Sequence, residues 1–288
     1  MAITYLVLSI VFSTFINLIF RWFKDYNVNK FQAIVVNYLV CFIVGFSFSN
    51  NHAILQHITT DWFPYCIALG FFFVAIFFSM ALTTEKMGIS VTAVSGKMSV
   101  VIPILFAYFY ANEELSSLFI IGLVLSLCSI YFISIKQGLQ LDKKHLLLPI
   151  IVFMGGGIID TSLKVLESTY GTDVGMDTIS YSIFLGAFIA GILLFTIRNK
   201  RNFKVLEKKS IVAGVVLGVP NYFSIFFLLS AIAGFSKQSA LVFGINNIGI
   251  VLVSTILSVL IFKEKLSKAN KLGLGLALVS IGIIAYAS

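Results

Sequence analysis

Apolar residues run in long stretches along the whole chain, and short polar segments separate these stretches. Each stretch is close to the ~20 residues that an α-helix needs to cross the hydrocarbon core of a bilayer. The pattern therefore predicts an all-α polytopic membrane protein with mostly short connections. The ten expected transmembrane helices lie at residues 3–20, 31–48, 62–82, 89–110, 115–135, 145–166, 176–197, 210–231, 239–262 and 271–287.

The composition agrees with a protein whose surface faces lipid rather than water. Hydrophobic residues make up 59% of the chain and charged residues only 11%, and the mean hydropathy is +1.03. Soluble domains carry about 25% charged residues, so a soluble fold is excluded. The net charge of +8 is typical of cytoplasmic loops, and no nucleic-acid partner is expected.

Basic residues are concentrated on one side of the predicted membrane. Apart from Lys97, Lys164 and Lys237, every Lys and Arg falls in or beside a loop that follows an odd-numbered span. Loops rich in Lys and Arg stay in the cytoplasm. This bias predicts a multi-pass protein of the cytoplasmic (inner) membrane with both termini outside.

A hairpin in the middle of the chain returns near the C-terminus after a shift of 151 residues. The matched pairs include Glu113 with Glu264, Leu115 with Leu266, Ser116 with Ser267 and Gly122 with Gly273. The chain thus divides into two five-helix repeats, residues 1–138 and 139–288. Because each repeat has an odd number of spans, equivalent helices cross in opposite directions, as in the inverted repeats of many secondary transporters.

The hairpin resembles the drug/metabolite transporter (DMT) superfamily in its EamA-like branch. It combines an apolar helix containing Pro103, an acidic turn, a Leu-Ser step and a Gly-rich helix. The resemblance implies transport of a small metabolite, more often efflux of amino acids or similar compounds than uptake. Two features depart from relatives of this kind. The second half holds Asn246 and Asn247 where the related nucleotide-sugar and triose-phosphate translocators hold basic residues, and the charge bias inverts the family's usual cytoplasmic termini.

Lys97 lies near the middle of the fourth predicted span. A charged side chain at that depth costs roughly 2.5–3.5 kcal/mol on insertion scales unless it is paired or hydrated, which makes it a candidate for function. In the functional interpretation Lys97 binds a carboxylate or phosphate, or takes part in proton coupling. In the structural interpretation it is tied to carbonyls and to hydroxyls such as Ser95 or Ser99.

Amides and one tyrosine are further candidates for substrate binding. Asn246 and Asn247 lie at the matching depth of the ninth span, next to Gly244 and Gly249. Amides can donate to and accept from a zwitterionic or heterocyclic substrate, but they can equally hydrogen-bond between helices. The remaining polar candidates within spans, each more typical of a structural role, are Asn17, Asn37, Asn221 and Tyr222.

Asp160 follows three consecutive glycines and precedes Lys164 by four residues, which places both charges on one helix face. A local ion pair is favoured slightly over a protonatable carboxylate that couples transport to protons. The acidic residues at the hairpin turns, Glu113, Glu114 and Glu264, are expected to cap or pin the hairpins rather than to touch substrate.

The function expected from these features is a secondary transporter of a small polar or amphipathic metabolite, more often an exporter, that works by alternating access. The first four spans of each repeat would line a cavity, and the fifth would buttress it. No catalytic cluster, metal-ligand spacing or phosphate-binding loop is found, so neither an enzyme nor a cofactor is expected. The alternative is a membrane-embedded scaffold or lipid-handling protein. Gly122, Gly273, Gly275 and Gly282 are expected in close helix packing or in a homodimer contact.

Overall fold

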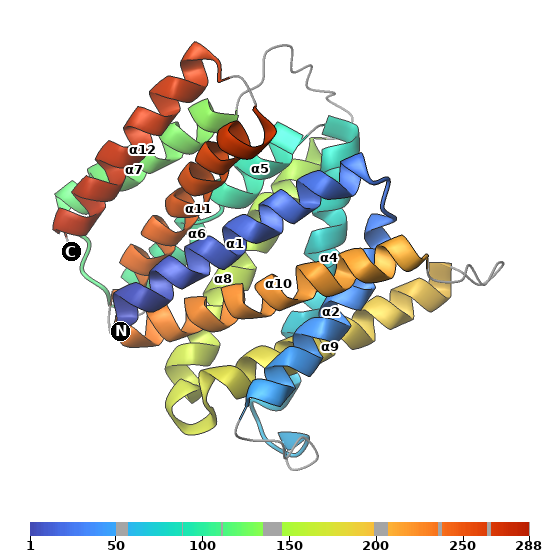
Figure 1. Ribbon diagram of the computed structural model, residues 1–288. Coiled ribbons are helices and arrows are strands. Elements are labelled where there is room, and N and C mark those ends of the chain that lie inside the picture. The colour runs from blue at the N-terminus through green and yellow to red at the C-terminus, as the bar shows by residue number, and fades with distance from the viewer. Residues whose placement is uncertain are drawn as a thin grey trace.

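A computed structural model describes residues 1–49, 57–87, 89–110, 112–134, 146–198, 207–235, 238–263 and 266–287, and within these ranges the regular structure is helical. The helices are shown in Figure 1. Their bounds are α1 (Ala2–Asp25), α2 (Lys30–Phe48), α4 (Phe63–Met87), α5 (Ile89–Met98), α6 (Val101–Phe109), α7 (Ser117–Ser134), α8 (Leu147–Val174), α9 (Met176–Arg198), α10 (Lys208–Gly234), α11 (Ser239–Phe262) and α12 (Lys268–Ala287).

Eight of the described helices are long and apolar enough to cross a membrane. Two shorter apolar helical segments, Val94–Phe109 and Ser117–Ile133, correspond to the fourth and fifth expected spans. The expectation of a helical protein with several membrane spans is therefore confirmed.

The fourth expected span is not one continuous helix. It divides into α5 and α6 at Ser99–Val100, and Pro103 explains the break. Proline has no backbone N–H, so it cannot donate to the Ser99 carbonyl four residues earlier. That carbonyl instead accepts from the Ile102 N–H at 2.9 Å, and the Ser99 hydroxyl donates to the Gly96 carbonyl at 2.7 Å. The backbone near the centre of this span is consequently irregular.

The sixth expected span ends later than the hydrophobic pattern indicates. We expected it to end at residue 166, but α8 continues to Val174 and stops at Gly175, whose φ of 90° favours glycine. Glu167 at the start of this extension forms an ion pair of 3.0 Å with Lys164, which lies near the end of the expected span. The predicted start of the span at His145 lies outside the described residues.

Among the described helices, α1, α2, α4, α8, α9, α10, α11 and the α5–α6 pair form a closed circuit of packed neighbours (Figure 1). In this circuit α1 packs against α10, α10 against α2, α2 against α9, α9 against α4, and α4 against α8. The circuit closes because α8 contacts α5 and α6, α6 contacts α11, and α11 contacts α1. The helices α7 and α12 pack extensively against each other at the margin of the bundle, beside α5 and α11.

The largest hydrophobic cluster lies at one end of the bundle, which we call the terminal end because α1 begins and α12 ends there. The cluster draws buried side chains from nine of the described helices. They include Leu6 of α1, Cys66 of α4, Ala107 of α6, Phe243 of α11 and Ile284 of α12. Towards the opposite end the clusters are smaller, such as the one around Ile19, Phe23, Ala33 and Leu217.

Candidate functional site

Lys97 lies in the last turn of α5, directly before the break, and is half-buried. Its charge interacts with that of Asp160, which is half-buried on α8. Among the described residues, no carboxylate comes within ion-pair distance of Lys97. Lys97 and Asp160 therefore interact electrostatically but do not form a direct salt bridge.

Glycines on α8 bring this helix close to the break. A Cβ atom on Gly156 would lie 2.8 Å from the Ser99 hydroxyl oxygen, and a Cβ atom on Gly157 would overlap the Ile102 side chain. Asp160 follows these glycines by one helical turn, so it lies on the same side of α8. The chain therefore places Asp160 beside the irregular backbone that follows Lys97.

The expected ion pair between Asp160 and Lys164 is wrong. The Lys164 amine donates to the Glu167 carboxylate at 3.0 Å instead. Both spacings, i to i+4 and i to i+3, bring side chains together on a helix, so spacing alone could not choose between the partners. The interaction of Asp160 with Lys97 joins separate helices and has no local sequence signal.

Asn246 and Asn247 are both buried on α11. Asn247 donates its amide to the Phe243 carbonyl of its own helix at 3.2 Å, whereas the Asn246 side-chain oxygen has no hydrogen-bond partner among the described residues. Ile248 and Leu252 of the same helix pack against Ala277 of α12. At 100° per residue, the two asparagines therefore flank the side of α11 that faces away from α12.

Asn17 joins this part of the molecule through α1. Its amide donates to the Ser254 hydroxyl of α11 at 3.0 Å, in an exposed position. Since α11 also contacts α6, Asn17, Asn246, Asn247 and Lys97 are carried by spans that are neighbours in the circuit.

The remaining candidates form a separate polar cluster between α2 and α10. The Asn221 amide donates to the Asn37 side-chain oxygen at 3.2 Å, and the Cys41 thiol donates to the Gly218 carbonyl at 3.2 Å. Tyr222 is only 1% exposed. Its ring stacks on Phe226 with a centroid distance of 5.9 Å and occupies the space that a Cβ atom at Gly45 would need. These contacts give the cluster a role in helix packing.

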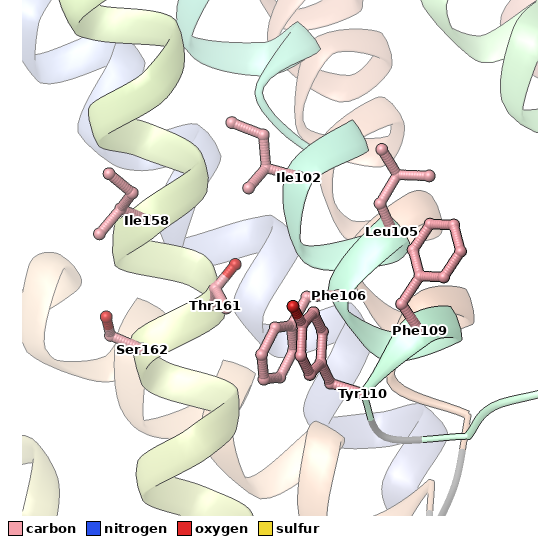
Figure 2. A pocket seen from close by; sticks show the side chains of 8 residues that line it. All are labelled: Ile102, Leu105, Phe106, Phe109, Tyr110, Ile158, Thr161 and Ser162. Atoms are coloured by element: carbon pink, nitrogen blue, oxygen red, sulfur yellow. The ribbon is translucent and has the colours of Figure 1, made fainter.

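Two apolar grooves follow the contact between α8 and the α5–α6 pair, and the pattern of polar residues along the chain predicted neither of them. The first, of about 370 Å³, lies between α6 and α8 (Figure 2). The second, of about 270 Å³, lies between α5 and α8. The first is lined by Ile102, Leu105, Phe106, Phe109, Tyr110, Ile158, Thr161 and Ser162.

Glu113 caps a helix, but this helix is α11 in the other half of the chain and not, as we expected from the sequence, part of the Glu113 hairpin. The residue is 4% exposed, and its carboxylate accepts from the backbone N–H groups of Ser239 and Ala240, both at 3.0 Å, and from the Ser239 hydroxyl. The neighbouring Glu114 is exposed. Glu264 lies outside the described residues.

The expected packing role of the glycines holds for two of the four. Gly122 meets Ile284 of α12, and Gly273 meets the backbone of Ile133 on α7. Among the described residues, none lies within 4 Å of a Cβ atom placed on Gly275 or Gly282, so for these two the expectation of packing within this part of the chain is wrong.

The helices and their hydropathy define a polytopic membrane protein. No family model matches the sequence. An uncharacterized protein of Haemophilus influenzae (strain ATCC 51907 / DSM 11121 / KW20 / Rd) is 30% identical over 289 aligned positions, which cover 98% of this chain and 97% of that protein. The chain belongs to the same family as this H. influenzae protein.

A protein of known crystal structure has a similar fold. The two superpose with a TM-score of 0.75 at 13% sequence identity, over 99% of this chain and 97% of the other. The likeness shows that nearly the whole arrangement of helices occurs in another protein.

Proposed function

We propose that the protein is a secondary transporter of the DMT superfamily, in its EamA-like branch, that exports a small polar or amphipathic metabolite across the cytoplasmic membrane. The observation that carries this proposal is the charged pair at the break of the fourth span. Lys97 and Asp160 lie on adjacent helices inside an apolar bundle and interact without a direct salt bridge. Intramembrane charges are costly and are a feature of substrate and ion pathways.

The pairing of helices supports a five-plus-five inverted repeat of ten spans, in which the α5–α6 pair counts as one span. A two-fold relation between the halves exchanges α1 with α8, α2 with α9, α4 with α10, the α5–α6 pair with α11, and α7 with α12. Under this exchange the contact of α1 with α10 matches that of α8 with α4. The contact of α1 with α11 likewise matches that of α8 with α5 and α6, while α7–α12 and α2–α9 map onto themselves.

The broken span suits a binding site near the middle of the membrane. Discontinuous helices expose backbone groups that can coordinate substrate or ions in transporters of this architecture. In the proposed site the Lys97 ammonium attracts an anionic group of the substrate, and Asp160 carries the coupling proton. Asn246 and Asn247 supply amides from the equivalent helix of the other half, and the unpartnered Asn246 oxygen is available as an acceptor.

The grooves along α8 favour one alternative, a protein that handles lipids. Both are lined mainly by apolar side chains, and an acyl chain would suit such a surface. This alternative gives no role to Lys97 and Asp160, which do not line either groove, so transport remains our proposal.

Flux measurements in proteoliposomes test the transport function. A thermal-shift screen of metabolites on the purified protein selects the compound, and its radiolabelled form is then followed across the membrane. Wild-type protein should move the compound, and Lys97→Ala and Asp160→Asn should lose nearly all flux.

Lys268→Ala is the matched control, because Lys268 is exposed at the start of α12; its flux should equal that of the wild type. If Lys97→Ala retained full flux, Lys97 would have no part in the mechanism. If no metabolite moved while added lipids were bound or transferred, the lipid-handling alternative would replace the proposal.

A further inference from the structure

The carboxylate of Glu113 connects the two halves of the chain at the terminal end. Glu113 follows α6 in the connection to α7, and its own N–H donates to the Ala107 carbonyl at 3.0 Å, which fixes the corner of the chain. Its side chain receives three hydrogen bonds from the first turn of α11. The first N–H groups of a helix have no partner within the helix, and the helix dipole favours a negative charge there.

These contacts lie against the largest hydrophobic cluster. Ala107, directly before the corner, and Ala240, directly under the carboxylate, are both members of this cluster. Cys66 of α4 is another member and is fully buried. Both α6 and α11 contribute to the packing that closes the terminal end, so separation of these two helices would open a route for water into the interior there.

We propose that Glu113 is a latch: its carboxylate holds the first turn of α11 against the α6–α7 corner and keeps the terminal end closed, and α11 must leave it for that end to open. The inference rests on the proposed transport function, for which it supplies a gate. Hydrogen bonds to a charged group are stronger than neutral ones, and they are concentrated here on one residue. Water entering the opened end can solvate the released carboxylate and the N-terminus of α11. The Glu113 carboxylate and the first N–H groups of α11 therefore have hydrogen-bond partners in both the closed and the open state.

The native cysteines report on this gate. Cys66 is buried at the terminal end, Cys41 is buried between α2 and α10, and Cys128 is exposed. In a Cys128→Ser background, the protein is placed in nanodiscs and treated with a water-soluble maleimide, and the labelling rate of each cysteine is followed by mass spectrometry. Glu113→Gln, which removes the charge and one acceptor, should label at Cys66 about tenfold faster than the background protein, with Cys41 unchanged.

Two further variants sharpen the test. Glu114→Gln alters the exposed neighbouring carboxylate and should leave both labelling rates unchanged. Ser239→Ala removes only the hydroxyl donor, so it should accelerate the labelling of Cys66 by a smaller factor than Glu113→Gln does.

An unchanged rate at Cys66 in Glu113→Gln would overturn the proposal. Equal acceleration at Cys41 and Cys66 would overturn it as well, because the carboxylate would then stabilise the whole fold rather than one end. The labelling needs no substrate, so its result is independent of the flux assay. If Glu113→Gln accelerated the labelling of Cys66 but no compound crossed the membrane, the latch would be supported and the transport function would be rejected.

Discussion

At the scale of single residues, the polar groups divide into those that pair with each other and those that are left available. Asn37 and Asn221 pair between α2 and α10, with Asn37 fully buried. Asn17 makes a comparable bond to Ser254 in an exposed position. We expect the loss in free energy of unfolding on removing each hydrogen bond to depend on how deeply that bond is buried.

Asn221→Ala should lower stability more than Asn17→Ala does. The first change removes the strongest partner of a fully buried amide, and interhelical hydrogen bonds in membranes contribute about 0.6 kcal/mol on average and up to ~1.7 kcal/mol. We expect a loss of about 1 kcal/mol for Asn221→Ala and a smaller loss for Asn17→Ala, measured by reversible unfolding in mixed micelles. Equal losses would show that burial does not separate the two bonds.

The sequence identified Lys97, Asp160 and the asparagines as candidates because polar residues stand out within apolar spans. It could not identify their partners. The interaction of Lys97 with Asp160 and the cap from Glu113 to Ser239 each join distant parts of the chain, and such contacts exist only once the helices pack. The four-residue spacing predicted an ion pair between Asp160 and Lys164, but Lys164 pairs with Glu167 instead.

At the scale of helices, close approach depends on glycines at particular crossings. A Cβ atom on Gly70 of α4 would overlap the backbone of α9 at Ile183 and Ala187, and one on Gly186 of α9 would lie 2.7 Å from the Ile67 Cα atom of α4. The two helices thus meet backbone to backbone, as small residues allow in membranes. Hydropathy predicted the approximate lengths of the spans, but it could not predict which glycines lie at helix crossings. Gly275, for example, was expected in close packing and has no described neighbour there.

Gly70→Ala should therefore be strongly destabilising. Overpacking costs typically 1–3 kcal/mol, and here the added methyl group meets backbone rather than a movable side chain, so we expect about 3 kcal/mol. Gly275→Ala is the matched control, since no described residue lies within 4 Å of its added Cβ atom; it should leave stability within about 0.5 kcal/mol of the wild type. Unfolding by denaturing detergent compares the two, and similar curves would contradict the close crossing.

At the scale of the whole molecule, the two ends of the bundle differ in packing and in charge. The large hydrophobic cluster lies at the terminal end, while nearly all the basic residues of the sequence fall in or beside the connections that follow α1, α4, α7, α9 and α11. The positive-inside rule predicts that these basic connections lie in the cytoplasm. In that orientation the terminal end, which carries the proposed Glu113 latch, would face outward.

A reporter at the C-terminus tests the orientation. An enzyme that is active only in the cytoplasm should give little signal when fused after residue 288, and one that is active only outside should give a strong signal. The same two reporters placed in the basic loop after α9 should give the reverse result. Strong cytoplasmic activity at the C-terminus would overturn the orientation, and with it the outward position of the latch.

The circuit of helices also has a consequence for biosynthesis. Among the described elements, α1 and α2 make their extensive contacts with α9, α10 and α11, all of which the ribosome produces later. Spans of a membrane protein insert individually before they associate, and contacts between distant parts of the chain form slowly. The first spans must therefore stay in the bilayer without their final neighbours until most of the chain is made. During that interval the polar side chains of α1 and α2 lack the partners on α10 and α11 that they have in the folded bundle, such as Asn221 for Asn37 and Ser254 for Asn17.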